Sequence, residues 1–152
     1  HHLTENERLL LEIAARLHDI GHFVNTLEHD KHGYYLLCYH PLIGLTAAEQ
    51  AVVANLVRYH RKDTPTIADE NYKLLPPKDR LAVTKLCALL RLADALDTSH
   101  TSRVQTVDLE QRREGLWQLK LSGDGEFMLE KWTLEKRKTL FQDVFGIKLE
   151  IA

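Results

Sequence analysis

Apolar residues recur with helical spacing at the start of the chain. Between residues 4 and 20 they lie three and four positions apart, at Leu10, Ile13, Ala14, Leu17 and Ile20. This is the pattern of an amphipathic helix. Thr4 and Glu7 have the spacing of a capping box at its start, and a glycine follows its end. We therefore predict a helix over this segment, with His18 and Asp19 in its last turn.

The same periodicity predicts three further helices, over residues 30–39, 46–60 and 78–97. The second of these begins with another capping box, and His60 ends its apolar face. The third carries Asp94 and Asp97 on the side that also bears its apolar residues. Residues 61–79 are rich in Asp, Thr, Pro and Lys, which is typical of a surface loop.

The pattern changes from helical to alternating after residue 98. Residues 116–121 alternate as a strand does, a further short strand is expected over 104–109, and glycines follow at a tight turn. A helical face over 134–145 and a last strand over 147–151 complete the order. We predict a mainly α chain, in which a small α+β tail of ββαβ order follows the helices.

Composition narrows the class of protein. The chain has 152 residues, 44% of them hydrophobic and 28% charged, which fits one globular domain or one domain with a small appendage. A formal net charge of −2 excludes whole-molecule attraction to DNA or an anionic membrane, and no apolar run approaches the roughly 20 residues that span a bilayer. Cys38 and Cys87 lie in apolar helical patterns, which suits buried free thiols and a cytoplasmic location.

The number of histidines is unusual, since the sequence contains nine. His1 and His2 fit a purification-tag remnant as well as a native start, so we assign them no chemistry. Four predicted helices end their apolar stripes with an imidazole or a carboxylate, at His18, Asp19, His32, His60 and Asp94. We expect these groups to meet in one buried pocket, and we expect His22 and His29 to face water.

Two explanations of such a pocket stay open on the residues alone. Buried imidazoles and carboxylates are costly unless they are paired or bound to metal. A divalent cation (Mn²⁺, Fe²⁺, Zn²⁺ or, with fewer histidines, Mg²⁺) would satisfy both groups. The alternative is a metal-free hydrogen-bond network, in which Asp94 pairs with Arg58, Arg61 or Arg91.

Four ordered strings carry a family resemblance, namely LHDIGH at 17–22, KHGYY at 31–35, VRYHRK at 57–62 and LRLADALD at 90–97. With its β-rich end, the chain resembles the HD-domain superfamily of metal-dependent phosphohydrolases. More narrowly, it is similar to the C-terminal HD-like region of the exopolyphosphatase/guanosine pentaphosphate phosphatase (Ppx/GppA) family. The resemblance implies an HD-type helical domain over residues 1–100 and a small α+β tail subdomain over residues 101–152.

The resemblance also implies which residues hold metal. His18, Asp19 and Asp94 match the core HD motif, and His32 and His60 match the extra histidines of two-metal members. In that superfamily one or two divalent ions polarise a phosphate and activate water. A bound metal does the latter by bringing the pKa of the water toward about 7.

A polyanionic substrate follows from the same resemblance, either polyphosphate or a guanosine polyphosphate. Basic side chains near the four strings are expected to contact it, at Lys31, Arg58, Arg61, Lys62 and Arg91. In that family the phosphatase activity is attributed to N-terminal actin-like domains, which this chain does not contain. We therefore expect the actin-like domains and a second copy of the chain, in a homodimer, as its partners.

Two other functions remain open. The chain is alternatively an independent HD phosphohydrolase that acts on nucleotides or phosphodiesters with its own two-metal centre. The second alternative is a structural dimerisation module, in which the histidine and aspartate cluster forms a hydrogen-bond network without metal.

Overall fold

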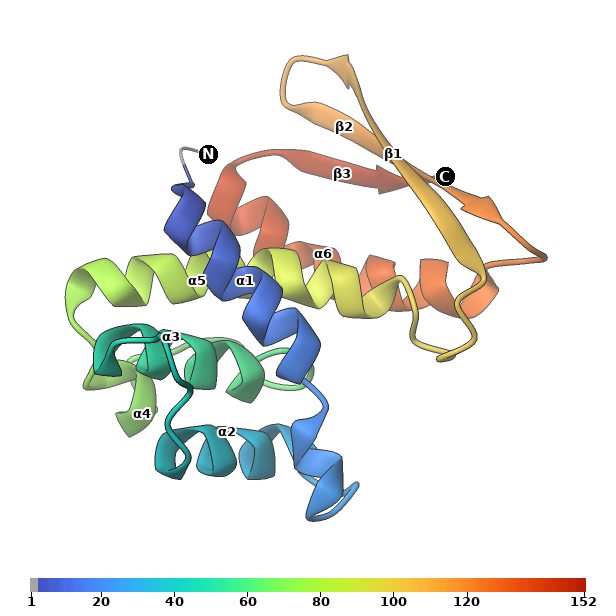
Figure 1. Cartoon of the computed structure of the whole chain (residues 1–152). Helices are drawn as coiled ribbons and strands as arrows, with labels where there is room; N and C mark the ends of the chain where they lie inside the picture. The colour runs from blue at the N-terminus through green and yellow to red at the C-terminus, as the bar shows by residue number, and fades with distance from the viewer. Residues whose placement is uncertain (1–2) are drawn as a thin grey trace. The chain divides into compact units, whose positions relative to one another are not determined.

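The computed structural model describes residues 3–152, and the chain divides into two compact units, residues 1–90 and 91–152. The division falls inside one helix, α5 (Pro77–Ala95), which begins in the first unit and ends in the second. Figure 1 labels the α-helices and the strands of both units. The domain division proposed after residue 100 stays a prediction. Within residues 3–152, no helix is both long and apolar enough to cross a membrane.

The first unit is helical, as predicted. It contains α1 (Glu5–Leu17), the short 3₁₀ helix η1 (Ile20–Phe23), α2 (His29–Tyr39), α3 (Ala47–Arg58), α4 (Glu70–Lys73) and most of α5. Both predicted capping boxes are confirmed, since Thr4 and Glu7 bond reciprocally, as do Thr46 and Glu49. The first helix stops at Leu17, earlier than predicted, because the chain turns into η1.

The core of the first unit is built around α3, whose residues 52–57 are all buried. This helix packs against α1 and α2. Apolar side chains of α1, α2 and α5 surround it, including Leu10, Ala14, Leu37, Val83 and Leu86. Each of the leucine and valine side chains contributes about 1.5–3 kcal/mol when it is fully buried. The ends of α2 and α3 are therefore held in fixed positions by the core.

Two glycines allow η1 and α2 to approach each other and α3 closely. A Cβ atom at Gly21 would collide with the carbonyl oxygen of His29. A Cβ atom at Gly33 would lie 2.7 Å from Cγ1 of Val57. Because neither glycine has a side chain, the residues just before η1 come directly beside the first turn of α2.

The second unit has the predicted ββαβ order. After the end of α5 come β1 (Val104–Arg113), β2 (Leu116–Gly123), α6 (Met128–Phe145) and β3 (Lys148–Ile151). The sheet has the order β1-β2-β3, with β1 antiparallel and β3 parallel to β2. One face of the sheet carries most of its apolar side chains, and Leu119 and Leu149 are buried there. The prediction of a mainly α chain with a small α+β part is confirmed.

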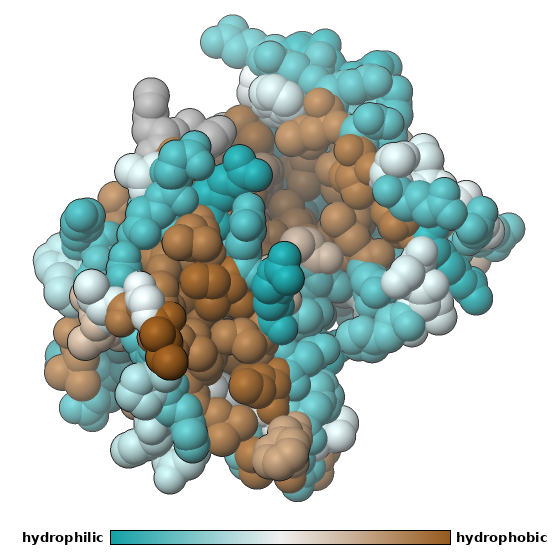
Figure 2. All heavy atoms as spheres, in the orientation of Figure 1, coloured by the Kyte–Doolittle hydropathy of each residue, from teal (hydrophilic) through white to brown (hydrophobic). Residues whose placement is uncertain are grey.

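The surface of the first unit has an apolar area on the side drawn in Figure 2. A groove of about 480 Å³ lies there, between α1 and the loop after α2, and it is lined by Leu9, Ile13, Leu17, Leu42, Ile43 and Leu45. Cys38 is exposed on α2, so its predicted burial is wrong, whereas Cys87 is buried as expected. The prediction failed because α2 is covered on one side only.

Candidate metal centre

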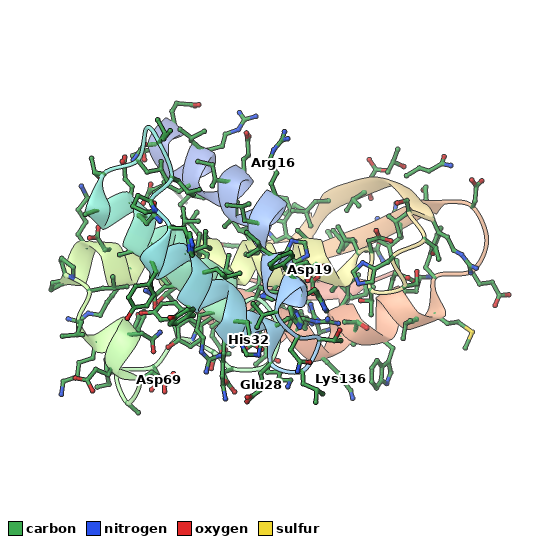
Figure 3. All side chains as sticks on the ribbon, turned by 60° about the horizontal axis from the view of Figure 1, so that its bottom comes forward. Arg16, Asp19, Glu28, His32, Asp69 and Lys136 are labelled. Carbon is green, nitrogen blue, oxygen red and sulfur yellow. The ribbon has the colours of Figure 1, made fainter. Side chains whose placement is uncertain are left out.

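The carboxylate of Asp19 lies among four imidazoles. Its Oδ1 atom is 3.4 Å from Nε2 of His29, 3.5 Å from Nε2 of His22 and 3.9 Å from Nε2 of His60. Its Oδ2 atom is 3.4 Å from Nε2 of His18. Figure 3 turns this side of the first unit toward the viewer and labels Asp19, Glu28 and His32. Segments that are far apart in the sequence therefore bring their side chains to one carboxylate.

Local structure explains why these segments meet. His18 and Asp19 follow α1, and the amide of His22 donates to the carbonyl oxygen of Asp19 at 3.0 Å, which begins the turn of η1. The close packing at Gly21 then places His22 over His29, with their rings stacked at 4.0 Å between centroids. His60 enters from the end of α3, and its side chain is completely buried.

Backbone carbonyls fix the orientation of three of the rings. Nδ1 of His18 lies 2.7 Å from the oxygen of Ala15, and Nδ1 of His60 lies 2.6 Å from that of Val57. Nδ1 of His29 lies 3.3 Å from the oxygen of Thr26. A carbonyl oxygen only accepts, so each Nδ1 carries the hydrogen and donates it. In the neutral rings, Nε2 is left with its lone pair, as in metal-binding histidines.

His29 and His60 make the strongest case for a cation. Their Nε2 atoms lie 3.1 Å apart, so two neutral rings would point lone pairs at each other. Either one ring takes up a proton or both rings share a positive ion. Burial lowers the pKa of His29, and the charges of His22 and Arg61 act in the same direction against the Thr26 carbonyl and Asp19. The protein therefore opposes the proton at this position.

The spacing of the ligand atoms fits one divalent cation. At metal–ligand bonds of about 2.1 Å, two ligands at octahedral right angles lie about 3.0 Å apart, and two at the tetrahedral angle about 3.4 Å apart. The pairs joining Asp19 to His22 and His29, and His29 to His60, span 3.1–3.5 Å. Oδ1 of Asp19 is also buried without a hydrogen bond among residues 3–152. Such a mixed set suits Mn²⁺, Fe²⁺ or Zn²⁺.

Three of the predicted ligands come together, and two ligand candidates were missed. His18, Asp19 and His60 meet as expected. The expectation that His29 faces water is wrong, because its side chain is only 8% exposed. His22 keeps an exposed outer side, but its Nε2 faces Asp19. Its spacing three residues after Asp19, one helical turn, was the signal available in the sequence.

The other two predicted ligands are His32, on α2, and Asp94, near the end of α5. His32 is on α2, one turn after His29, and across residues 3–152 its ring makes none of the Asp19 contacts. Asp94 belongs to the second unit, where Nη1 of Arg137 pairs with its Oδ2 and also donates to the carbonyl of Arg91 at 3.4 Å. Ligand roles for His32 and Asp94 remain predictions.

The predicted basic residues are arranged in three ways. Arg58 binds two carboxylates, at 2.8 Å from Asp30 and 2.9 Å from Asp63. Lys31 pairs with Glu28, and this bond is the main reason why the pKa of Glu28 is lowered, with Lys62 adding to the effect. The charge of Arg61 acts on His29, as described above, whereas Arg91 is buried in the second unit.

Comparison with known proteins gives one family and several relatives. Residues 1–140 match the family described as Ppx/GppA phosphatase, domain III. A Pseudoalteromonas atlantica protein named guanosine-5'-triphosphate,3'-diphosphate pyrophosphatase is 28% identical over 137 residues, which cover 84% of this chain and 26% of that protein. Proteins of the same name from two strains of Vibrio cholerae serotype O1 are 29% identical over 121 residues, which cover 79% of this chain and 23% of theirs. The chain spans about a quarter of the length of these relatives.

Proposed function

The chain belongs to the Ppx/GppA phosphatase family, as its domain III, and we propose that it is the HD-type, metal-holding region of a phosphohydrolase that acts on guanosine pentaphosphate or inorganic polyphosphate. The single observation that carries this proposal is the 3.1 Å separation of the His29 and His60 Nε2 atoms. The proposed substrate class is based on the relatives, which are named guanosine-5'-triphosphate,3'-diphosphate pyrophosphatases.

Asp19, His29 and His60 would hold the ion, with His22 and His18 at its sides. A divalent ion held there would supply positive charge to a phosphate oxygen and would make a bound water more acidic. The protein contributes the orientation of the ligands, because the Nδ1 bonds hold the rings of His18, His29 and His60. Asp19 would contribute a negative charge, which neutralises part of the charge of the cation.

A polyphosphate chain would extend from this centre along the start of α2. Lys31, Arg61 and Lys62 lie close in sequence to His29 and His60. Lys31 and Lys62 lower the pKa of Glu28, and Arg61 lowers that of His29, so their charges reach this part of the surface. Each contact of an ammonium or guanidinium group with a phosphate is modest, but the contacts add along a polyanion. Further along α2, Tyr35 and Tyr39 form an exposed ring pair at 4.6 Å between centroids, which suits stacking on a guanine base.

Partners of the domain are part of the same proposal. The actin-like catalytic domains would carry out the chemistry, with this chain binding the substrate. Self-association of two copies would use β1, an edge strand of the sheet that exposes Val107 and Leu109. We place the function in the cytoplasm, since both cysteines are free thiols.

Metal titration tests the centre directly. The chelator-treated protein is titrated with Mn²⁺, and binding is followed by the electron paramagnetic resonance signal of the free ion. We expect one site per chain that is lost in His29→Ala and His60→Ala and kept in His40→Gln, which alters an exposed ring that bonds Leu36. A folded protein that binds no Mn²⁺, Fe²⁺ or Zn²⁺ would refute the metal centre and favour the metal-free dimerisation module.

Polyphosphate binding tests the ligand class. Affinity for inorganic polyphosphate is measured as salt concentration increases. Salt screens the attraction between basic side chains and phosphates, so binding that depends on this attraction becomes weaker. We expect a steep salt dependence, and weaker binding in Arg61→Met and Lys62→Met than in the control Arg112→Met, an exposed arginine in β1 of the second unit. Equal affinity in all three variants would contradict a basic binding surface next to His60. Turnover of a phosphodiester by the isolated chain would instead support an independent HD phosphohydrolase.

A further inference from the structure

Arg58 joins two carboxylates at the edge of the metal centre. Its Nη1 atom lies 2.8 Å from Oδ2 of Asp30, and its Nη2 atom lies 2.9 Å from Oδ2 of Asp63. The side chains of Asp30 and Arg58 are 3% and 13% exposed, whereas that of Asp63 is 54% exposed. The planar guanidinium group is suited to such a double bond, because its donors point in fixed directions.

The two carboxylates belong to the segments that carry His29 and His60. Asp30 directly follows His29 at the start of α2, and Asp63 comes three residues after His60. Arg58 itself is the last residue of α3, two residues before His60. One side chain therefore links the segment that carries His29 to the segment that carries His60. The Nε2 atoms of these two histidines lie 3.1 Å apart.

The start of α2 needs such a tie. Its N-cap residue, Glu28, has a φ of 54°, and its side chain accepts no capping hydrogen bond from the first turn of the helix. A non-glycine residue in the left-handed region is strained and persists only where surrounding contacts hold it. The Asp30–Arg58 pair is a buried ionic contact between the first turn of α2 and the end of α3.

We propose, as a consequence of the metal centre proposed above, that Arg58 is a positioning residue for His29 and His60 and does not contact the phosphate chain. Both ends of its guanidinium group are engaged by carboxylates. Its withdrawal toward a phosphate would leave the charge of Asp30 buried without its partner, which is strongly unfavourable. The phosphate contacts then fall to Lys31, Arg61 and Lys62.

Arg58→Lys is the informative substitution, because it keeps the positive charge and removes the forked geometry. Removal of a group that orients metal ligands typically weakens metal binding by about 10–100-fold. We expect this loss of Mn²⁺ affinity in Arg58→Lys and in Asp30→Asn. We expect the double variant to lose no more than the worse single variant, since the two residues act as one unit. The absorption spectrum of bound Co²⁺ should change as well, because the ligand geometry changes.

Polyphosphate affinity, measured at Mn²⁺ concentrations that saturate each variant, separates positioning from phosphate contact. We expect it to be unchanged in Arg58→Lys. Unchanged Mn²⁺ affinity together with weaker polyphosphate binding would overturn the inference and make Arg58 a phosphate contact. Unchanged Mn²⁺ affinity together with a lower melting temperature would also overturn it, because the pair would then only stabilise the fold.

Two further variants keep the experiment decisive. Arg8→Lys alters an exposed arginine whose Nε bonds Glu12 at 3.0 Å, and it should leave both affinities unchanged. If the Arg58 and Asp30 variants fail to fold, Asp63→Asn removes only the exposed half of the tie, and it should weaken Mn²⁺ binding by about two- to fivefold. Unchanged affinity in Asp63→Asn would then count against the inference. A wild-type chain that binds no Mn²⁺ would instead refute the proposed metal centre itself.

Discussion

Arg137 of α6 forms a buried ion pair with Asp94 near the end of α5, within the second unit. The side chain of Asp94 is only 5% exposed and that of Arg137 is 11% exposed. The same guanidinium group donates to the carbonyl oxygen of Arg91. The acidic residue that extends the apolar face of α5 is thus balanced by a residue 43 positions later in the chain. Any role of Asp94 as a metal ligand would have to compete with Arg137.

The first prediction concerns this pair. Arg137→Met removes one partner of a buried ion pair, so we expect the free energy of unfolding to fall by about 3–5 kcal/mol. Asp94→Asn in the same chain should restore part of the loss, because the buried negative charge is then removed as well. Urea denaturation at neutral pH measures both effects. A loss below about 1 kcal/mol in the single variant would contradict a structural role for the pair.

The second prediction concerns the close approach of η1 to α2. Gly21→Ala introduces a Cβ atom that collides with the backbone of His29, so we expect about 1–3 kcal/mol of destabilisation and weaker Mn²⁺ binding. Denaturation and metal titration measure the two effects. Gly125→Ala is the control, because nothing lies within 4 Å of that position and only its φ of +90° is strained. Similar Mn²⁺ affinity in both variants would show that the approach does not form the centre.

These contacts also mark how far the sequence could predict the structure. The capping boxes at Thr4 and Thr46 are local signals, so the starts of α1 and α3 were predicted correctly. His18, Asp19 and His60 were predicted as site residues because each lies at the end of the apolar face of a helix. That face packs against the core, so the core fixes the side of the helix on which these residues lie. Periodicity alone was therefore enough for about half of the candidate site.

The rest depends on contacts between distant segments. The burial of His29 requires Gly21 to bring η1 against α2, and no pattern within either segment reveals it. Arg58 forms ion pairs with Asp30 and Asp63, and Arg137 forms one with Asp94. The partners in these pairs are far apart in the sequence or separated by a turn. From the sequence, Arg58 was expected to contact phosphate, and Arg58, Arg61 or Arg91 was the alternative partner of Asp94. The pairs of Arg58 with Asp30 and Asp63, and of Arg137 with Asp94, were not predicted.

The third prediction is a pH dependence of stability. Ser99 donates a 2.6 Å hydrogen bond to Oε1 of Glu130, and this bond is the main reason why the pKa of Glu130 lies below its ordinary value of 4.5, although burial opposes the shift. The folded chain then binds the proton less readily than the unfolded chain. The stabilisation is therefore complete above about pH 4.5 and is lost as the pH falls through the folded pKa.

Ser99→Ala tests this dependence. We expect it to reduce the free energy of unfolding by about 1–2 kcal/mol near pH 6, and we expect the difference from wild type to shrink toward about pH 3. Urea denaturation across this range measures it, with the exposed Ser122→Ala as a control that should show no such trend. A difference that stays constant with pH would mean that the hydroxyl acts through packing and not through the charge of Glu130.

The last prediction separates the two substrates. Tyr35 and Tyr39 are 60% and 69% exposed, and their rings contact each other on the outer side of α2. A guanine base can stack on such rings, whereas inorganic polyphosphate has no base and gains nothing from them. Stacking of one base on an aromatic side chain contributes about 1–3 kcal/mol. We therefore expect Tyr35→Ala and Tyr39→Ala to weaken binding of guanosine pentaphosphate by about fivefold or more and to leave polyphosphate binding unchanged.

Isothermal titration calorimetry with both ligands, at one salt concentration and saturating Mn²⁺, measures this difference. Tyr34→Phe is the matched control, because Tyr34 lies on the same helix but is half-buried. If both tyrosine variants bind guanosine pentaphosphate as well as wild type does, the base does not lie on α2. If they weaken both ligands equally, the tyrosines act by holding α2 and the basic residues beside it, and the preference for a guanosine substrate must come from residues of the larger enzyme.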